Sequence, residues 1–266
     1  MALRAPLRLS LIGGFALRRG TQELKIAISG QRLIALLALS ERQVGRLRVA
    51  GTLWPDYSTE RSLADLRTTL WRVNQCGRQV IAATPSRLGL DDDIVVDVRN
   101  LVAFARRLNQ AGITPEAIDL DSMNFADLVG DLLPDWYDDW LQDEREVLRQ
   151  TRLHALESLA RQLSASGRHA DAIQAALAAI RLEPLRETAH YVLIEIHLAE
   201  GNWSEACRQF ERCRRLLKED LGVEPSDSMR LLLGRRCSGL PSSPASLHAR
   251  PRRSAGTKSA TLLRSP

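Results

Sequence analysis

The spacing of hydrophobic residues changes near residue 30, from short alternating runs to a period of three to four. The alternating runs and their Gly-containing turns predict short strands over residues 7–12, 15–18 and 25–28, with a turn near Gly20-Thr21. The helical period then predicts three helices, over residues 31–40, 46–53 and 59–75. A β-hairpin is predicted over residues 79–84 and 87–90. This order predicts a winged helix-turn-helix, whose third helix enters the major groove of DNA and whose hairpin is the wing.

The third predicted helix has an apolar and a polar face. Helical spacing places four apolar side chains on one side, Leu63, Leu66, Leu70 and Val73. It places two arginines, a hydroxyl and an indole on the other, Arg67, Thr68, Trp71 and Arg72. Because arginine binds phosphate oxygens or a guanine edge, such a helix can pack on a domain and still contact DNA. The alternative is an ordinary amphipathic helix with a solvated basic face, and Trp71 could instead pack beneath the hairpin.

From residue 97 onward the helical period continues almost throughout, and part of the pattern repeats after 34 residues. Gly167 recurs as Gly201, and Ala172 recurs as Ala206. Small residues let antiparallel helices approach closely, and glycines open the turns between them, as is typical of tetratricopeptide repeats. A generic pair of helical hairpins is the alternative. The expected fold class is α+β, a winged helix-turn-helix of the response-regulator type followed by an all-α tetratricopeptide-like domain.

Charge is distributed unevenly along the chain. Lys and Arg number 14 against 8 Asp and Glu in residues 1–96, 18 against 24 in residues 97–236, and 5 against 0 in residues 237–266. We therefore expect a DNA-binding domain over residues 1–96, a separate acidic helical domain over residues 97–236, and a disordered basic tail over residues 237–266. The tail is interpreted as a solvated end that adds at most weak nonspecific attraction to DNA.

The sequence shows no pattern typical of a membrane protein, a metal site or an enzyme. No apolar run approaches the roughly 20 residues that span a bilayer, so we expect no membrane partner and a cytoplasmic, nucleoid-associated protein. The four cysteines form no C-x-x-C pair, which argues against a disulfide framework or a zinc site. His190 and His197 occupy helix-packing positions rather than a metal-binding spacing. An acidic cluster is interpreted as structural: Asp135, Asp138, Asp139, Asp143 and Glu144. No phosphate loop, serine elbow or dinucleotide fingerprint occurs, so we expect no enzymatic activity, cofactor or metal.

Several motifs carry a family resemblance. They are GQRL at residues 30–33, LWPD at 53–56, SLADLRTTLWR at 62–72, LLPDWYDDW at 132–140 with Glu144-Arg145, and LGVEPS at 221–226. The first three resemble the DNA-binding domain of the Streptomyces antibiotic regulatory protein (SARP) transcription factors. The last two resemble the opening and the close of their bacterial transcriptional activator domain. The resemblance covers about residues 3–235.

The resemblance implies a sequence-specific DNA-binding transcriptional activator. By similarity, the third helix is the recognition helix, with Arg67, Thr68, Trp71 and Arg72 as its outward contacts. Arg61 and Arg87 are expected to contact the DNA backbone. The implied ligand is double-stranded promoter DNA with direct repeats, the implied partners are RNA polymerase and its sigma factor, and the implied target is a secondary-metabolite gene cluster. We also expect self-association on DNA, with two copies filling tandem half-sites cooperatively.

Two departures from the family pattern weaken the expected wing contacts and the start of the second helix. The hairpin turn is Pro85-Ser86 where the family has a Gly-Tyr pair, and Gly45 stands where the family has a Ser or Thr cap. The absence of a phosphate loop predicts the small two-domain form. The alternative function is a tetratricopeptide-type interaction scaffold with a winged helix that docks something other than DNA, which would leave the basic third helix unexplained.

Overall fold

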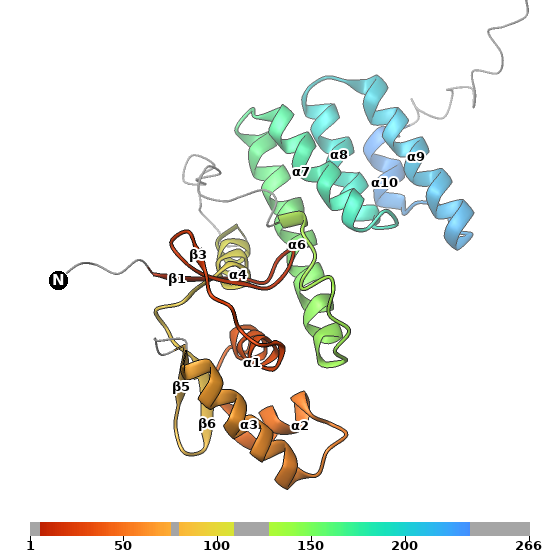
Figure 1. Cartoon of the computed structure of the whole chain (residues 1–266). Coiled ribbons are helices and arrows are strands. Elements are labelled where there is room, and N and C mark those ends of the chain that lie inside the picture. Colours follow the sequence, from red (N-terminus) through yellow and green to blue (C-terminus); the bar gives the residue numbers. More distant parts are fainter. Residues whose placement is uncertain (1–5, 76–79, 109–127, 235–266) are drawn as a thin grey trace, which may run out of the picture.

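The computed structural model describes residues 6–75, 80–108 and 128–234, and it begins with a small sheet (Figure 1). The sheet has the order β3-β2-β1-β7 and is formed by β1 (Leu7–Ser10), β2 (Ala16–Arg19), β3 (Gln22–Glu23) and β7 (Val95–Val96). β1 pairs antiparallel with β2 and parallel with β7. The strand predicted over residues 25–28 is wrong: β3 directly follows the turn at Gly20-Thr21, and Ile28 already begins a helix.

Three helices and a hairpin follow, as the sequence predicts. The helices are α1 (Ile28–Leu39), α2 (Arg46–Leu53) and α3 (Thr59–Asn74). The hairpin is formed by β5 (Ile81–Ala83) and β6 (Arg87–Leu90), and Gln79, predicted to belong to it, lies outside the described residues. A short strand that the sequence did not predict, β4 (Val44–Gly45), pairs with β6 and ties the start of α2 to the hairpin.

Helices α1 and α3 approach closely at Gly30. A Cβ added at this glycine would lie 2.8 Å from Ile26 Cγ2 and 2.9 Å from Val73 Cγ2. Both neighbours are β-branched, so their methyl groups have little rotamer freedom to move away. Gly30→Ala is therefore expected to lower the free energy of unfolding by about 1–3 kcal/mol, the usual cost of overpacking a core.

Gly51, in α2, provides a matched control for this substitution. An added Cβ there meets nothing within 4 Å, so Gly51→Ala is expected to raise the stability by about 0.5–1 kcal/mol through its better helix propensity. Urea unfolding of both variants checks the pair. A Gly30→Ala protein as stable as the wild type would contradict the close packing of α1 on α3.

The second half of the chain is helical within the described residues. Its helices are α4 (Asp97–Leu108), α6 (Trp140–Ala165), α7 (His169–Leu182), α8 (Glu187–Ala199), α9 (Trp203–Leu221) and α10 (Asp227–Leu233). Two antiparallel pairs, α6–α7 and α8–α9, stand side by side (Figure 1). The turns within the pairs contain Gly167 at φ 76° and Gly201 at φ 79°, a conformation that favours glycine. Ala172 and Ala206 are fully buried, so the 34-residue period corresponds to a repeated helical hairpin.

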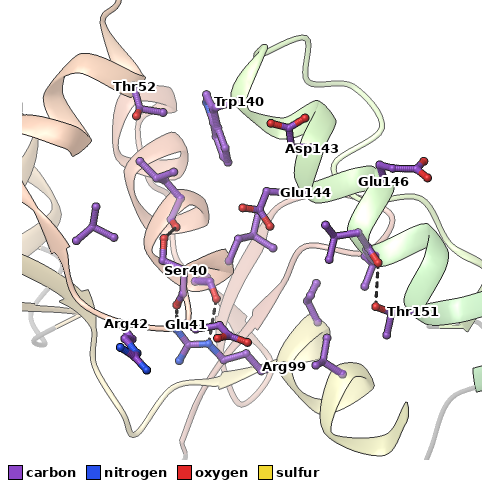
Figure 2. A pocket seen from close by; sticks show the side chains of 18 of the residues that line it. Ser40, Glu41, Arg42, Thr52, Arg99, Trp140, Asp143, Glu144, Glu146 and Thr151 are labelled. Carbon is purple, nitrogen blue, oxygen red and sulfur yellow. Dashed lines mark hydrogen bonds between the residues drawn. The ribbon is translucent and has the colours of Figure 1, made fainter. Parts of the chain in front are cut away.

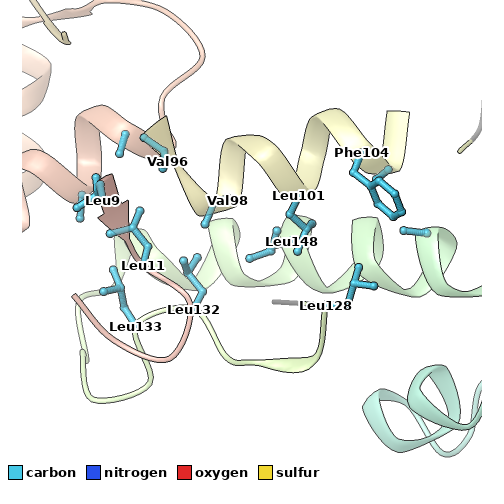
Figure 3. Close-up of a cluster of buried hydrophobic side chains, with 14 of the residues drawn as sticks. Leu9, Leu11, Val96, Val98, Leu101, Phe104, Leu128, Leu132, Leu133 and Leu148 are labelled. Carbon is cyan, nitrogen blue, oxygen red and sulfur yellow. The ribbon is translucent and has the colours of Figure 1, made fainter. Parts of the chain in front are cut away.

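The two halves share one hydrophobic core. β7 lies in the first sheet and runs directly into α4, which packs on both β1 and α6. Leu9, Leu11, Leu101 and Leu148 meet between these elements (Figure 3). The predicted domain boundary between residues 96 and 97 therefore falls inside packed structure, where the chain passes from β7 to α4.

Polar contacts reinforce this junction at the start of α4. The Asp97 carboxylate accepts hydrogen bonds from the backbone N–H groups of Leu11, at 2.8 Å, and Ile12, at 3.0 Å. Arg99, two residues later, donates to the carbonyls of Leu37 and Ala38 near the end of α1. Carbonyls at a helix end have no partner within the helix, so Arg99 satisfies groups that α1 would otherwise leave unpaired.

The loop before α6 is held against the first sheet. Leu133 N donates to Leu11 O at 2.9 Å, and Leu133 is fully buried at a φ of 44°. Arg145 of α6 reaches back into this loop and donates to the carbonyls of Leu132, at 3.0 Å, and Trp136, at 2.8 Å. The Trp136 ring stacks on Phe15 with the ring centroids 6.2 Å apart.

Part of the acidic cluster lies in this loop and has structural contacts. Asp138 forms an ion pair with Arg32 of α1 and accepts a hydrogen bond from Trp140 Nε1 at 3.2 Å. These two contacts support a structural role for Asp138. Among the described cysteines, Cys213 is free and buried.

His190 is a buried packing residue of α8 with both ring nitrogens satisfied. Its Nε2 lies 2.9 Å from the Pro184 carbonyl, which can only accept, so Nε2 carries the proton. Its Nδ1 lies 2.6 Å from Gln209 Nε2 and accepts from that amide. Burial lowers the pKa of His190 from its usual 6.5 because it disfavours the charged ring.

This lowered pKa predicts a pH dependence of stability. Below about pH 6.5 the unfolded chain takes up a proton at His190 that the folded chain resists, so the free energy of unfolding falls as the pH falls. Urea unfolding at pH 8, 7, 6 and 5.5 measures the slope. His190→Gln should be less stable at pH 8 but show a flatter profile over this window, and an unchanged profile would contradict the assignment.

Candidate nucleic-acid interface

α3 is positioned by its cap, by a buried hydroxyl and by its apolar face. Ser58 caps the helix, and its Oγ accepts from Arg61 N at 3.4 Å. Ser62 is buried and its Oγ donates to the Trp54 carbonyl at 3.1 Å, which joins α3 to the end of α2. The predicted apolar face packs inward: Leu66, Leu70 and Val73 are buried and Leu63 is partly buried against the core.

The predicted polar face of α3 points outward. Arg67, Thr68, Trp71 and Arg72 are all exposed, and Trp71 retains 64% of its accessible surface. The alternative in which Trp71 packs beneath the hairpin is therefore wrong. Within the described residues, the side chains of Arg67 and Arg72 form no hydrogen bond or ion pair, so both guanidinium groups are available to a ligand.

Arg61 and Arg87, the two predicted backbone contacts, are exposed but held by the protein. The Arg61 guanidinium lies over the Tyr57 ring, 4.1 Å from its centroid, which orients it at the start of α3. Arg87 Nη1 donates to the Gln43 carbonyl at 3.1 Å. Arg87 therefore has part of its hydrogen-bonding capacity engaged inside the protein, whereas Arg67 and Arg72 do not.

Arg46 contacts the hairpin turn and was not among the residues selected from the sequence. Its Nε donates to the Thr84 carbonyl at 3.0 Å in the hairpin turn, and its backbone N–H donates to the Ser86 carbonyl at 3.0 Å. These contacts join the first residue of α2 to the hairpin. This contact could not be predicted from the sequence because Arg46 and the hairpin turn lie almost forty residues apart in the chain.

A groove of about 1660 Å³ lies on another side of α2, between the end of α1, α2, α4 and α6 (Figure 2). Residues of both charges line it, among them Arg42, Arg48, Asp143 and Glu144. Burial raises the pKa of Glu144, and the neighbouring charge of Asp143 adds to this. By contrast, a hydrogen bond from Arg149 lowers the pKa of Glu146 to about 2.

No cluster of His, Cys, Asp or Glu side chains suited to a metal ion occurs in the described parts of the chain. No described helix is long and apolar enough to cross a membrane.

Comparison with known proteins assigns the family. Residues 95–234 match the family model of the bacterial transcriptional activator domain. The chain belongs to this family. Regulatory protein AfsR of Streptomyces griseus is 28% identical over 231 residues, which cover 82% of this chain and 23% of AfsR. AfsR of Streptomyces coelicolor is 28% identical over 237 residues, which cover 85% of this chain and 24% of AfsR.

These matches support the resemblance to SARP regulators. The chain spans about a quarter of the length of the curated relatives it matches. The solved structure of Mycobacterium tuberculosis EmbR in complex with a low affinity phosphopeptide is similar at a TM-score of 0.68 and 22% identity, covering 86% of this chain and 64% of that chain. This likeness shows a shared fold that extends over both halves of the described structure.

Proposed function

We propose that this chain is a sequence-specific DNA-binding transcriptional activator, with α3 as the recognition helix of a winged helix-turn-helix. The outward face of α3 carries the proposal. It presents two guanidinium groups that have no partner among the described residues, together with an exposed indole, on a helix whose other side is buried. A helix of this kind fits the major groove, where arginine binds phosphates and guanine edges. The β5–β6 hairpin is the proposed wing, with Arg87 and Arg61 beside the DNA backbone.

The domains that we propose follow the distribution of charge along the chain. Residues 1–96 are the proposed DNA-binding domain, and residues 97–236 are the proposed activator domain that contacts RNA polymerase and its sigma factor. Residues 237–266, proposed as a solvated basic tail, lie outside the described residues. The proposed targets are promoters of a secondary-metabolite gene cluster in the cytoplasm, a target class that rests on the similarity to the SARP family.

Selection from a pool of random duplexes tests DNA recognition directly. The expected result is an enriched motif with two copies in direct orientation, bound with an affinity that falls steeply with salt because phosphate contacts release counterions. Recovery of no motif, together with retention of no duplex at low salt, would instead support the scaffold alternative.

Tandem binding is a separate part of the proposal. Copies on a direct repeat are related by translation along the DNA, so they need no two-fold axis and no stable dimer in solution. Analytical ultracentrifugation with duplexes carrying one or two half-sites is expected to show cooperative filling of the second site. Independent filling of the two sites would contradict self-association on DNA.

A further inference from the structure

The centre of the exposed face of α3 is apolar. Ala64, Thr68 and Trp71 follow one another at spacings of four and three, so they lie along one line of the helix. Arg67 flanks this line on one side, and Arg61 and Arg72 flank it on the other. A helix face that is only solvated has no use for a large apolar ring at its centre, yet the Trp71 side chain lies there with 64% of its surface exposed.

The hydroxyl of Thr68 strengthens this apolar character. Thr68 Oγ1 donates its hydrogen to the Ala64 carbonyl, one turn earlier, at 3.1 Å. A hydroxyl has a single hydrogen, so Thr68 cannot at the same time donate to a base. Its oxygen can still accept a hydrogen bond, and its γ-methyl group belongs to the residue that lies between Ala64 and Trp71 on this line of the helix.

We infer that this line recognises the 5-methyl groups of thymine, and that Thr68 is a specificity-determining residue through its methyl group. In the major groove the thymine methyl is the one apolar feature among the base edges, and alanine and threonine methyl groups contact it. The flanking arginines are suited to guanine or to phosphate. The recognised half-site is therefore an A·T-containing step with guanines or backbone contacts on either side. This inference rests on the proposed function.

Removing the methyl groups from the DNA and from the protein tests the inference. Starting from a duplex obtained by the selection, each thymine is replaced in turn by deoxyuridine, which lacks only the 5-methyl group. At one or two positions the affinity of the wild type should fall about four-fold, the factor expected for one buried methyl group. Thr68→Ser, which keeps the hydroxyl and loses the methyl, should lose a similar factor and become insensitive to deoxyuridine at one of these positions.

Thr68→Val is the matched control, because it keeps the methyl and the branched shape but loses the hydroxyl. It should bind within about two-fold of the wild type and remain sensitive to deoxyuridine, with the fold of each variant checked by thermal unfolding. A Val variant that binds more weakly than the Ser variant would show that the hydroxyl is the reading group, and a wild type indifferent to deoxyuridine at every thymine would also overturn the inference. Both results presuppose a duplex that the wild type binds, so they are distinct from failure of the proposed function, in which no duplex is retained.

Discussion

Replacing Arg67 and Arg72 together with alanine is expected to weaken binding to the selected duplex by about 2–6 kcal/mol, since each such arginine contributes about 1–3 kcal/mol. Both side chains are exposed and, within the described structure, form no hydrogen bond or ion pair. Their loss removes contacts to DNA without removing a contact that stabilises the fold. The affinity should therefore fall while the thermal unfolding temperature stays the same.

Salt titration separates the two roles that an arginine can have. A lost phosphate contact reduces the slope of log K against log salt by about 0.9, whereas a lost guanine contact mainly reduces discrimination between sequences. Arg214→Ala is the control for each single replacement on α3, because it removes one positive charge from α9, at the far end of the helical half (Figure 1). Equal losses for Arg214→Ala and for the α3 variants would mean that overall charge, and not α3, governs binding.

Arg145→Ala is expected to lower the free energy of unfolding by about 2–4 kcal/mol, the range for losing charged hydrogen bonds whose acceptors are left unpaired. Arg145 donates to the carbonyls of Leu132, Leu133 and Trp136, and these carbonyls belong to the loop that packs on β1. Without the guanidinium, these partly buried groups lose their partner. Urea unfolding measures the change.

Arg149 lies one turn later on α6 and is the matched control. Its ion pairs with Glu146 and Glu183 lie near the surface, where such pairs contribute about 0–1 kcal/mol. Arg149→Ala should therefore cost far less than Arg145→Ala. Similar losses in both variants would indicate that α6 is sensitive to any arginine replacement, and that the loop contacts of Arg145 have no special weight.

The helices around the proposed interface could be predicted well from sequence because their signals are local. The bounds predicted for α2 agree with the structure, and those predicted for α3 differ by one residue at its end. A hydroxyl cap, a proline after Trp54 and a leucine every three or four residues all act within one or two helical turns. The 34-residue repeat was likewise predicted from the spacing of small residues, and its two glycines have positive φ in the structure.

The strands and the state of individual side chains were less predictable. The alternation at residues 25–28 suggested a strand, but pairing with β2 ends at Glu23, and short strands depend on a partner more than on their own pattern. The exposure of Trp71 was also open, because a large ring at that position can face the solvent or the hairpin. The choice depends on where the hairpin packs.

The sequence by itself determined the two faces of α3, the order of the elements and the repeated helical hairpin, because each depends on residues close together in the chain. Only the tertiary structure decided that β7 pairs with β1, that Arg145 holds the loop before α6, and that Thr68 uses its hydrogen within the helix while Trp71 stays exposed. The strand pairing joins residues that lie 87 positions apart in the chain, such as Leu9 and Val96, and the other contacts depend on the pose of a single side chain. Many pairings of such segments satisfy the same local pattern, and only the packed core selects one of them.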